Sequence, residues 1–260
     1  MVKYSVNNSI ALIQIDRTDQ LNALSIDILN KLDDKFTKAI NDNNVLVIIL
    51  TGRGKKSFIA GADISEMKNM NSEEAINYSR VGQKLTQKIE NSDKPVIAAV
   101  NGLAIGGGFE MAMGCDLLIA ADHVEFGLPE MPLGIVPDAG ALQRLPRRIP
   151  HNIAMEMFLL GRRMTATEAA HYGLVNKVVP KEQLMDAARE WAASIAWSAP
   201  LAMQSVKEVQ REIECVPLEK AFHKMRTDPM PTYRKMLKSG DAKEGVAAFV
   251  EKRNPEFKGE

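Results

Sequence analysis

The amino-acid sequence predicts an α/β fold that ends in a helical region. Over about three quarters of the chain, strand-like apolar runs alternate with helix-like segments, a pattern typical of parallel βαβ units with right-handed crossovers. From about Lys181 onward nearly every segment has a helical pattern, which Pro229-Met230-Pro231 interrupts. We therefore expect an α/β core over residues 1–195 and a helical region over residues 196–260.

The expected core elements follow one another in a regular order. Strands are expected at five short apolar runs: Ile10–Ile15, Val45–Thr51, Lys94–Val100, Asp116–Ala121 and Val175–Val179. Two long helices are expected at Ser25–Asn41 and Ser72–Glu90, because a serine at each start can act as the N-cap. Shorter helices are expected after the glycine run Gly106–Gly108 and at Thr165–His171.

Four amphipathic helices are expected toward the C-terminus. They are Lys181–Ser194, Pro200–Ile213, Leu218–Arg226 and Ala242–Glu251. One α/β core is too small to cover the apolar faces of all of them, so contact with other subunits is expected.

The composition excludes several classes of protein. With 260 residues, 45% of them hydrophobic and 25% charged, the chain resembles an ordinary soluble globular protein. Its 33 basic and 33 acidic residues cancel, which argues against nucleic acid or an anionic membrane as a partner. The apolar runs are of strand length, too short to cross a membrane, and no spacing of ligands is typical of zinc. Cys115 and Cys215 lie far apart and no secretory leader is expected, so a cytoplasmic location is favoured over a disulfide framework.

The segment from Asn101 to Pro137 combines a glycine run with two carboxylates in an apolar stretch. At Gly106–Gly108 a helix can begin with no side chains over its first N–H groups, which can then bind an anionic oxygen. Glu110 follows directly, and Glu130 comes after a second turn signal. Two carboxylates beside an oxyanion site suit proton transfer next to a carbonyl group, so the segment predicts an enzyme. Alternatively, Glu110 is an ordinary acid of a first helical turn and Glu130 a turn residue.

A second glycine-containing segment precedes this one. Gly52–Ser57 places Arg53, Lys55 and Lys56 in a loop, which suits either a phosphate contact or a solvated turn. Ala60–Asp63 follows it as a small-residue turn at the start of a helix, and it is a second source of N–H donors for an oxyanion.

Four segments together resemble the crotonase superfamily, and in particular its enoyl-CoA hydratases. These are FIAGADISEM, NGLAIGGGFEMAMGCDLLIAAD, FGLPEMPLGIVPDAG and EGVAAFVEKRNPEFKGE, and the resemblance extends from about Ile10 to the C-terminus. VPDAGALQRLPRRIP, GRRMTATEAAHYGLVNKVVP and SAPLA are similar to the carnitinyl-CoA dehydratase subgroup. The resemblance implies repeated ββα units, a C-terminal trimerisation region, and trimers that pair as hexamers. It also implies that no cofactor is needed, since coenzyme A is part of the substrate.

The resemblance gives individual residues a role in adding water to, or removing it from, the 2,3 double bond of an acyl-CoA. The backbone N–H groups of Ala62 and Gly107 would hold the thioester oxygen as an enolate. Glu110 would activate water at Cβ, and Glu130 would deliver the proton to Cα. The alternative within the family is double-bond isomerisation, which usually needs only one of the two glutamates. A non-enzymatic CoA-binding or RNA-binding protein is disfavoured by the intact glutamates and the zero net charge.

The resemblance also implies where coenzyme A binds. The residues concerned are Gln20, Leu21, Lys56, Ala60 and Ile64 of one subunit, with Phe249 and Lys252 of a neighbouring subunit. Thr18-Asp19 stands where the family often has a proline and a lysine, and Ser65 where many members have a lysine. Charge contacts with the 3′-phosphate are therefore expected to be weaker, or to come from Arg53, Lys55 or Lys68.

Asp138 allows two interpretations. It follows Val136-Pro137 where many hydratases of the family have a glycine, so it is a candidate for the far end of the acyl pocket. There it would select an acyl group with a polar or cationic end, such as crotonobetainyl-CoA. The alternative is an N-cap for a helix that begins near Ala139, since aspartate is among the best capping residues.

Overall fold

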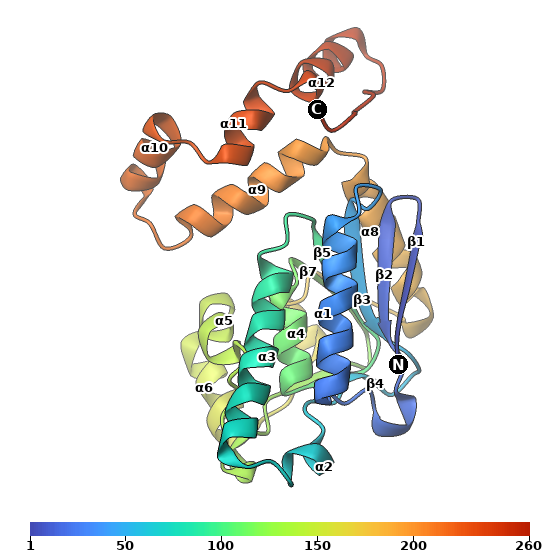
Figure 1. Ribbon diagram of the computed structural model, residues 1–260, viewed down its shortest axis with the longest axis vertical. Helices are drawn as coiled ribbons and strands as arrows, with labels where there is room; N and C mark the ends of the chain where they lie inside the picture. The colour runs from blue at the N-terminus through green and yellow to red at the C-terminus, as the bar shows by residue number, and fades with distance from the viewer.

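The computed structural model describes residues 1–260 as an α/β core with a helical region projecting from it (Figure 1). The main sheet has six strands in the order β1-β2-β3-β5-β7-β10, of which only β1 is antiparallel to its neighbour. Their bounds are Val2–Asn7, Ile10–Ile15, Val47–Gly52, Val96–Val100, Leu117–Ala121 and Lys177–Val179. The prediction of a parallel α/β core is confirmed.

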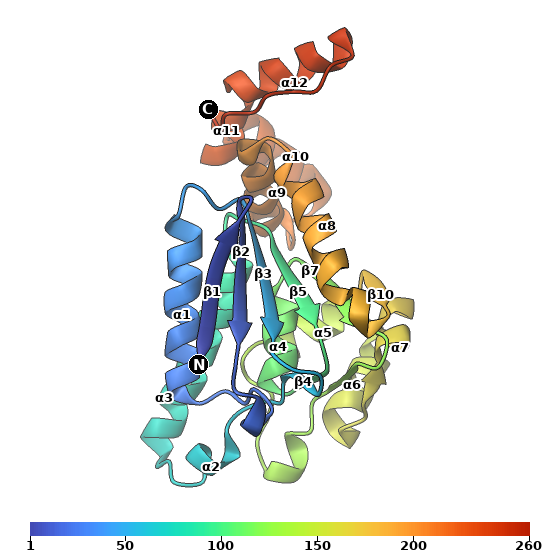
Figure 2. The same cartoon turned by 90° about the vertical axis from the view of Figure 1, so that its right-hand side faces the viewer.

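The central strands β3 and β5 are buried along their whole length. Unbroken apolar runs are expected there, because a parallel sheet has helices on both faces. Helix α8 (Leu184–Ala196) packs on one face, while α1 (Ile26–Asn41), α3 (Ser72–Glu90) and α4 (Gly107–Gly114) lie on the other (Figure 2).

A second, smaller sheet collects the short strands that follow the main strands. It has the order β4-β6-β8-β9, with bounds Ser57–Ile59, Leu103–Ile105, Glu125–Gly127 and Met164–Thr165. β3 is followed by β4, β5 by β6 and β7 by β8, so the repeated ββα units implied by the resemblance are present. The sequence analysis missed these strands, because two or three residues are too few to show a period.

The two long helices have the predicted extents, with one error in their N-caps. Ser25 is the N-cap of α1, and its Oγ accepts a hydrogen bond from the Ile28 N–H at 3.3 Å. Asn71 is the N-cap of α3, so the assignment of that role to Ser72 was wrong. Asn71 Oδ1 accepts from the N–H groups of Glu73 and Glu74, and the Glu74 carboxylate accepts from the Asn71 N–H at 2.9 Å. Glu74 lies three residues after Asn71 and closes this capping box, whereas the residue three positions after Ser72 is Ala75, whose side chain has no acceptor.

The remaining α-helices are α2 (Ile64–Met67), α5 (Ala141–Arg148), α6 (His151–Leu160), α7 (Ala166–His171), α9 (Pro200–Ile213), α10 (Leu218–Thr227), α11 (Pro231–Leu237) and α12 (Gly240–Glu251). Helices α6 and α11 were not predicted, and α5 was expected only as the alternative interpretation of Asp138. Pro231, expected to interrupt helical structure, occupies the first position of α11, where the missing N–H of proline costs nothing.

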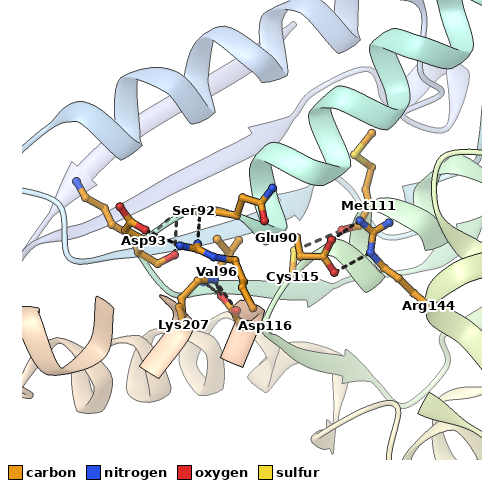
Figure 3. A network of polar contacts seen from close by, with 12 residues as sticks. Glu90, Ser92, Asp93, Val96, Met111, Cys115, Asp116, Arg144 and Lys207 are labelled. Atoms are coloured by element: carbon orange, nitrogen blue, oxygen red, sulfur yellow. Dashed lines mark hydrogen bonds and ion pairs between the residues drawn. The ribbon is translucent and has the colours of Figure 1, made fainter. Parts of the chain in front are cut away.

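Helices α9 to α12 project beyond the end of the main sheet (Figure 1). Helix α9 is joined to the core by ion pairs: Lys207 Nζ lies 2.5 Å from Asp116 Oδ1, and Arg211 lies 3.3 Å from Asp93 (Figure 3). The expected boundary after residue 195 falls in the last turn of α8. Across all of its helices, the structure offers none with the length and apolar character required to cross a bilayer.

Candidate active site

A cavity of about 540 Å³ lies where α2, α3 and the start of α4 meet the segment Pro129–Ala139. Seven residues expected to act at the site line it: Ala60, Ala62, Ile64, Gly107, Glu110, Glu130 and Asp138. They come from the ends of three successive ββα units. Ala62 follows β4, Gly107 and Glu110 follow β6, and Glu130 follows β8. The parallel arrangement thus brings together residues that lie far apart in the sequence.

The glycine run is required by close backbone contacts. A Cβ atom added to Gly108 would lie 2.1 Å from the Ile59 carbonyl oxygen, so only glycine lets α4 begin against β4. Gly106 has φ of 51°, and a Cβ there would lie 2.5 Å from Glu130 Oε1. The run therefore leaves room for the Glu130 carboxylate as well as for the turn into α4.

Two backbone N–H groups of the cavity wall lack an acceptor. The Ala62 N–H makes no backbone hydrogen bond, and Gly107, as the first residue of α4, has no acceptor for its N–H within that helix. Neighbouring contacts fix the Ala62 turn: the Leu24 N–H donates to the Gly61 carbonyl and the Asp63 N–H to the Leu24 carbonyl, both at 2.8 Å. The first turn of α4 also contributes the partial positive charge of a helix N-terminus.

Glu110 is buried, with 3% of its surface exposed. Its Oε1 accepts a hydrogen bond from the Ala141 N–H at 2.9 Å. Burial raises the pKa of Glu110 to about 7. The Ala141 N–H and, more weakly, the Ala139 N–H oppose that rise, while the nearby carboxylates of Glu130 and Asp138 add to it.

Glu130 is in a different hydrogen-bonding environment. Its Oε2 is buried and has no hydrogen-bond partner. Burial raises the pKa of Glu130 to about 7, and the Asp138 carboxylate adds to the rise. Glu110 thus accepts a hydrogen bond from another segment of the chain, whereas the Glu130 carboxylate is stabilised only by its own backbone N–H and its Oε2 has no partner.

Asp138 lines the cavity and is not a helix cap. Helix α5 begins at Ala141 with Gly140 at the N-cap position, so the capping interpretation was wrong. The Ala141 N–H at that helix start is bonded by the distant Glu110 carboxylate instead. Asp138 Oδ2 accepts a hydrogen bond from the Ser79 hydroxyl.

No lysine, arginine or histidine side chain lines the cavity, and apart from its carboxylates the lining is largely apolar. Five aliphatic side chains in its lining are more than a third exposed: Ile64, Ile76, Leu133, Ile135 and Val136. Exposed apolar side chains gathered at a cavity indicate that an apolar part of a ligand covers them.

Tyr78 of α3 is a cavity residue that the sequence analysis missed. Its hydroxyl donates a hydrogen bond to the Leu24 carbonyl at 2.7 Å, which ties α3 to the segment beside the Ala62 turn. Burial raises its pKa, so the phenol stays neutral. No local signal distinguishes this tyrosine from other residues of a long amphipathic helix.

A second cavity of about 290 Å³ lies at the basic loop and is lined by Leu21, Lys55 and Lys56 among others. The two lysines form no ion pair, whereas Arg53 is bonded to Asp16 at 2.6 Å. Gln20 lies beside this cavity in a short 3₁₀ helix and lines neither site.

One hydrogen bond links the walls of the two cavities: the Leu21 carbonyl of the second accepts from the Ala60 N–H of the first at 3.2 Å. Ser65, at a position where a lysine was expected from the resemblance, donates its hydroxyl to the Asp63 carboxylate at 2.5 Å. Arg17 pairs with the same carboxylate at 2.7 Å, so Ser65 helps to hold the turn that carries Ala62.

Phe249 and Lys252 lie at the C-terminal end of α12, at the opposite end of the chain's long axis from α2 and the cavity (Figure 1). Phe249 is 85% exposed. Within one subunit these residues contribute nothing to either cavity.

Comparison with known proteins identifies the family. Residues 5–260 match the sequence model of the family described as enoyl-CoA hydratase/isomerase. The chain belongs to this family. It is 43% identical over 253 residues to carnitinyl-CoA dehydratase of Escherichia coli strain K12, covering 97% of this chain and 96% of that protein. It is 40% identical over 255 residues to carnitinyl-CoA dehydratase of Proteus mirabilis, covering 98% and 97%.

Solved structures agree with this assignment. An enoyl-CoA hydratase from Bacillus anthracis superposes with a TM-score of 0.94 at 38% identity, covering 100% of this chain and 99% of that one. The resemblance inferred from the motifs is thus confirmed, together with the crotonase-like fold and the prediction of an enzyme of this family.

The raised pKa of Glu110 predicts a pH-dependent effect on stability. Because the folded-state pKa is about 7 and the ordinary value is 4.5, this carboxyl lowers the free energy of unfolding as the pH rises from 4.5 to 7. Glu110→Gln keeps an acceptor for Ala141 but cannot ionise. Relative to wild type, its free energy of unfolding should rise between pH 5 and pH 8, by at most about 3 kcal/mol. Urea unfolding of both proteins at several pH values measures this difference, and a constant difference would contradict it.

Proposed function

We propose that the protein adds water to, or removes it from, the 2,3 double bond of an acyl-CoA thioester through a stabilised enolate. The observation that supports this most directly is the joint lining of one cavity by two unbonded N–H groups and two buried carboxylates. The N–H groups of Ala62 and Gly107 form the oxyanion hole. Each such donor contributes about 3 to 4 kcal/mol of transition-state stabilisation, which a weakly acidic thioester Cα needs.

The two glutamates divide the proton transfers. In hydration, the Glu110 carboxylate takes a proton from water as the water oxygen bonds to Cβ, and the electron pair of the double bond moves onto the thioester oxygen. The enolate then takes the proton of Glu130 at Cα. The Ala141 N–H on Glu110 and the unbonded Oε2 of Glu130 support these starting protonation states. Afterwards Glu110 carries the proton and Glu130 the charge, so proton exchange with solvent restores the site.

Double-bond isomerisation is the alternative within the same family. It moves one proton between two carbons and usually needs a single carboxylate. Because Glu110 and Glu130 are both buried and both line the cavity, hydration is the better supported function.

Coenzyme A is proposed to extend from the acyl cavity to the basic loop. Its pantetheine would pass Ala60 and Ile64, and its phosphates would meet Lys55 and Lys56, the unpaired cations of the second cavity. The adenine would lie near Gln20 and Leu21. The proposed reaction uses no metal or further cofactor.

A homotrimer, or a dimer of trimers, is the proposed assembly. Large apolar side chains at the C-cap of α8 and in the C-terminal helices are exposed in the single chain: Trp197, Val206, Leu218, Phe222, Leu237, Val246, Phe249 and Val250. A neighbouring subunit would cover them and would place its Phe249 and Lys252 at the CoA pocket. A cytoplasmic role in fatty acid metabolism remains a prediction.

The catalytic assignment is tested by Glu110→Gln and Glu130→Gln. Each variant keeps size and hydrogen bonding but loses proton transfer, so each should lose hydration by at least roughly 100-fold while binding CoA normally. Loss of enoyl absorbance and product mass over a panel of acyl-CoA thioesters measures this. Glu125→Gln is the matched control, because Glu125 lies on β8 outside the cavity, paired with Arg163 at 2.8 Å. Near wild-type turnover in both test variants would refute the mechanism.

The assembly is tested by truncation before Asp241 and by Phe249→Ala. Truncation removes α12, so it should reduce both oligomer size in light scattering and CoA affinity. Phe249→Ala should lower CoA affinity without lowering protomer stability, because its side chain is exposed in the single chain. Leu160→Ala, which truncates a residue 77% exposed on α6, is the control. A fully active monomer would overturn the proposal.

The role of Asp138 in substrate choice is tested by Asp138→Asn. Since the cavity contains three carboxylates and no cation, an acyl group with a cationic end, as in crotonobetainyl-CoA, should gain from the Asp138 charge. Asparagine can still accept from Ser79. The variant should therefore lower kcat/KM for crotonobetainyl-CoA relative to crotonyl-CoA by roughly tenfold. An unchanged ratio would remove Asp138 from substrate selection.

A further inference from the structure

The turn from Asp138 to Ala141 separates the acyl cavity from another, polar cavity. This polar cavity has a volume of about 310 Å³, and both Asp138 and Ala139 line it as well as the acyl cavity. Its other walls are polar side chains of α3 and of the start of α5, including Gln83, Thr86 and Arg144. A single layer of backbone therefore separates the two cavities at this turn. On the side of the polar cavity, polar groups rather than packed apolar side chains contact it.

One face of α3 supplies most of those groups. Gln83 Nε2 donates to the Asp138 carbonyl at 3.0 Å, and Thr86 Oγ1 donates to the Ala139 carbonyl at 2.8 Å. The Ser79 hydroxyl donates to the Asp138 carboxylate. Positions 79, 83, 86 and 90 are spaced by three or four residues, so they form one stripe along the helix.

Arg144 holds the turn from the other side. Its Nη1 donates to the Ala139 carbonyl at 3.2 Å, while Nε and Nη2 bind the Glu90 carboxylate at 3.0 and 2.6 Å (Figure 3). The arginine side chain is buried, with 9% exposed. A Cβ added to Gly140 would lie 1.7 Å from Nη1, so the turn and the guanidinium fit only with glycine there.

We propose that Arg144, fixed by Glu90, is a positioning residue that holds the Asp138–Ala141 turn so that the Ala141 N–H stays on the Glu110 carboxylate. The inference rests on the proposed function for the role of Glu110 as the base. Arg144 itself lines only the polar cavity, on the far side of the turn from the reacting atoms.

The consequence of losing this positioning has a definite sign. The titratable groups that face Glu110 are Glu130, Asp138 and Tyr78, none of them a cation. The Ala141 N–H is the stronger of two backbone donors that favour the charged form of Glu110, the other being the Ala139 N–H of the same turn, so displacement of the turn weakens both. The pKa of Glu110 should then rise, so less of the enzyme would have a working base at neutral pH.

Three variants test the proposal. Arg144→Met removes both sets of bonds, and it should move the acidic limb of the pH profile of kcat/KM upward by about one unit, as expected for losing one hydrogen bond to a charged oxygen. Arg144→Lys keeps a cation for Glu90 but not both contacts, and it should give an intermediate shift. Thr86→Val leaves the Arg144–Glu90 pair intact and should give a smaller shift in the same direction, which covers the case that Arg144→Met fails to fold.

A second measurement needs no substrate. The Glu110 carboxyl can be titrated by carbon NMR of glutamate-labelled, ligand-free protein and assigned by its absence in Glu110→Gln. Lys88→Gln is the control, since it breaks an ion pair between α3 and Asp33 (2.5 Å) without touching the turn, and its Glu110 titration should match wild type.

The outcomes separate the two proposals. A higher pKa of Glu110 in Arg144→Met and Thr86→Val, with an unchanged pKa in Lys88→Gln, supports the positioning role. If these shifts occur but no acyl-CoA is hydrated, only the proposed function fails. An unchanged Glu110 titration and pH profile in the variants that fold, accompanied only by lower thermal stability, would overturn it and leave Arg144 a structural residue.

Discussion

The burial of two carboxylates in one apolar cavity is the constraint on which the rest of the site depends. A carboxyl group that is buried away from water resists ionisation, and a second carboxyl nearby makes its ionisation harder still. Hydrogen-bond donors in the cavity wall therefore determine which of the two carries a negative charge. Here the decision comes from the backbone: the Ala141 N–H bonds Glu110, and Glu130 Oε2 has no partner. Two chemically identical side chains are thereby given different hydrogen-bonding environments.

The fold makes this possible by bringing backbone unusually close to side chains. Each ββα unit ends at the same side of the core, so the residues after β4, β6 and β8 converge. The segments pack so closely there that a Cβ atom would not fit at either glycine of the pair Gly106 and Gly108. At Gly106 it would meet a carboxylate oxygen of Glu130, and at Gly108 the carbonyl oxygen of Ile59. The glycines lower the intrinsic stability of a helix start, and the contacts they permit explain why the chain has them there.

Sequence reasoning located the parts of the site that have a local signal. Gly106–Gly108 and Ala60–Asp63 mark backbone turns, and the glutamates follow at fixed distances from turn signals, so their convergence in one cavity was predictable. Asp138 was assigned two possible roles, and the capping role was wrong because α5 begins at Ala141 rather than near Ala139. The importance of Arg144 had no local signal, because an arginine in a helix is normally solvated and only the tertiary fold buries it against Gly140.

The distribution of charge links these features to the kind of ligand the site can accept. The unpaired lysines line the basic-loop cavity, whereas the only charged side chains of the acyl cavity are carboxylates, and the Ala60–Leu21 hydrogen bond links the walls of the two. A ligand that spans both must therefore carry its anionic groups at one end and a neutral or cationic group at the other. An acyl group ending in a carboxylate would add a fourth carboxyl group to the cavity, and its negative charge would raise the pKa values of Glu110 and Glu130 further. If the glutamates transfer protons as proposed, the same electrostatics disfavour acyl groups that end in a carboxylate.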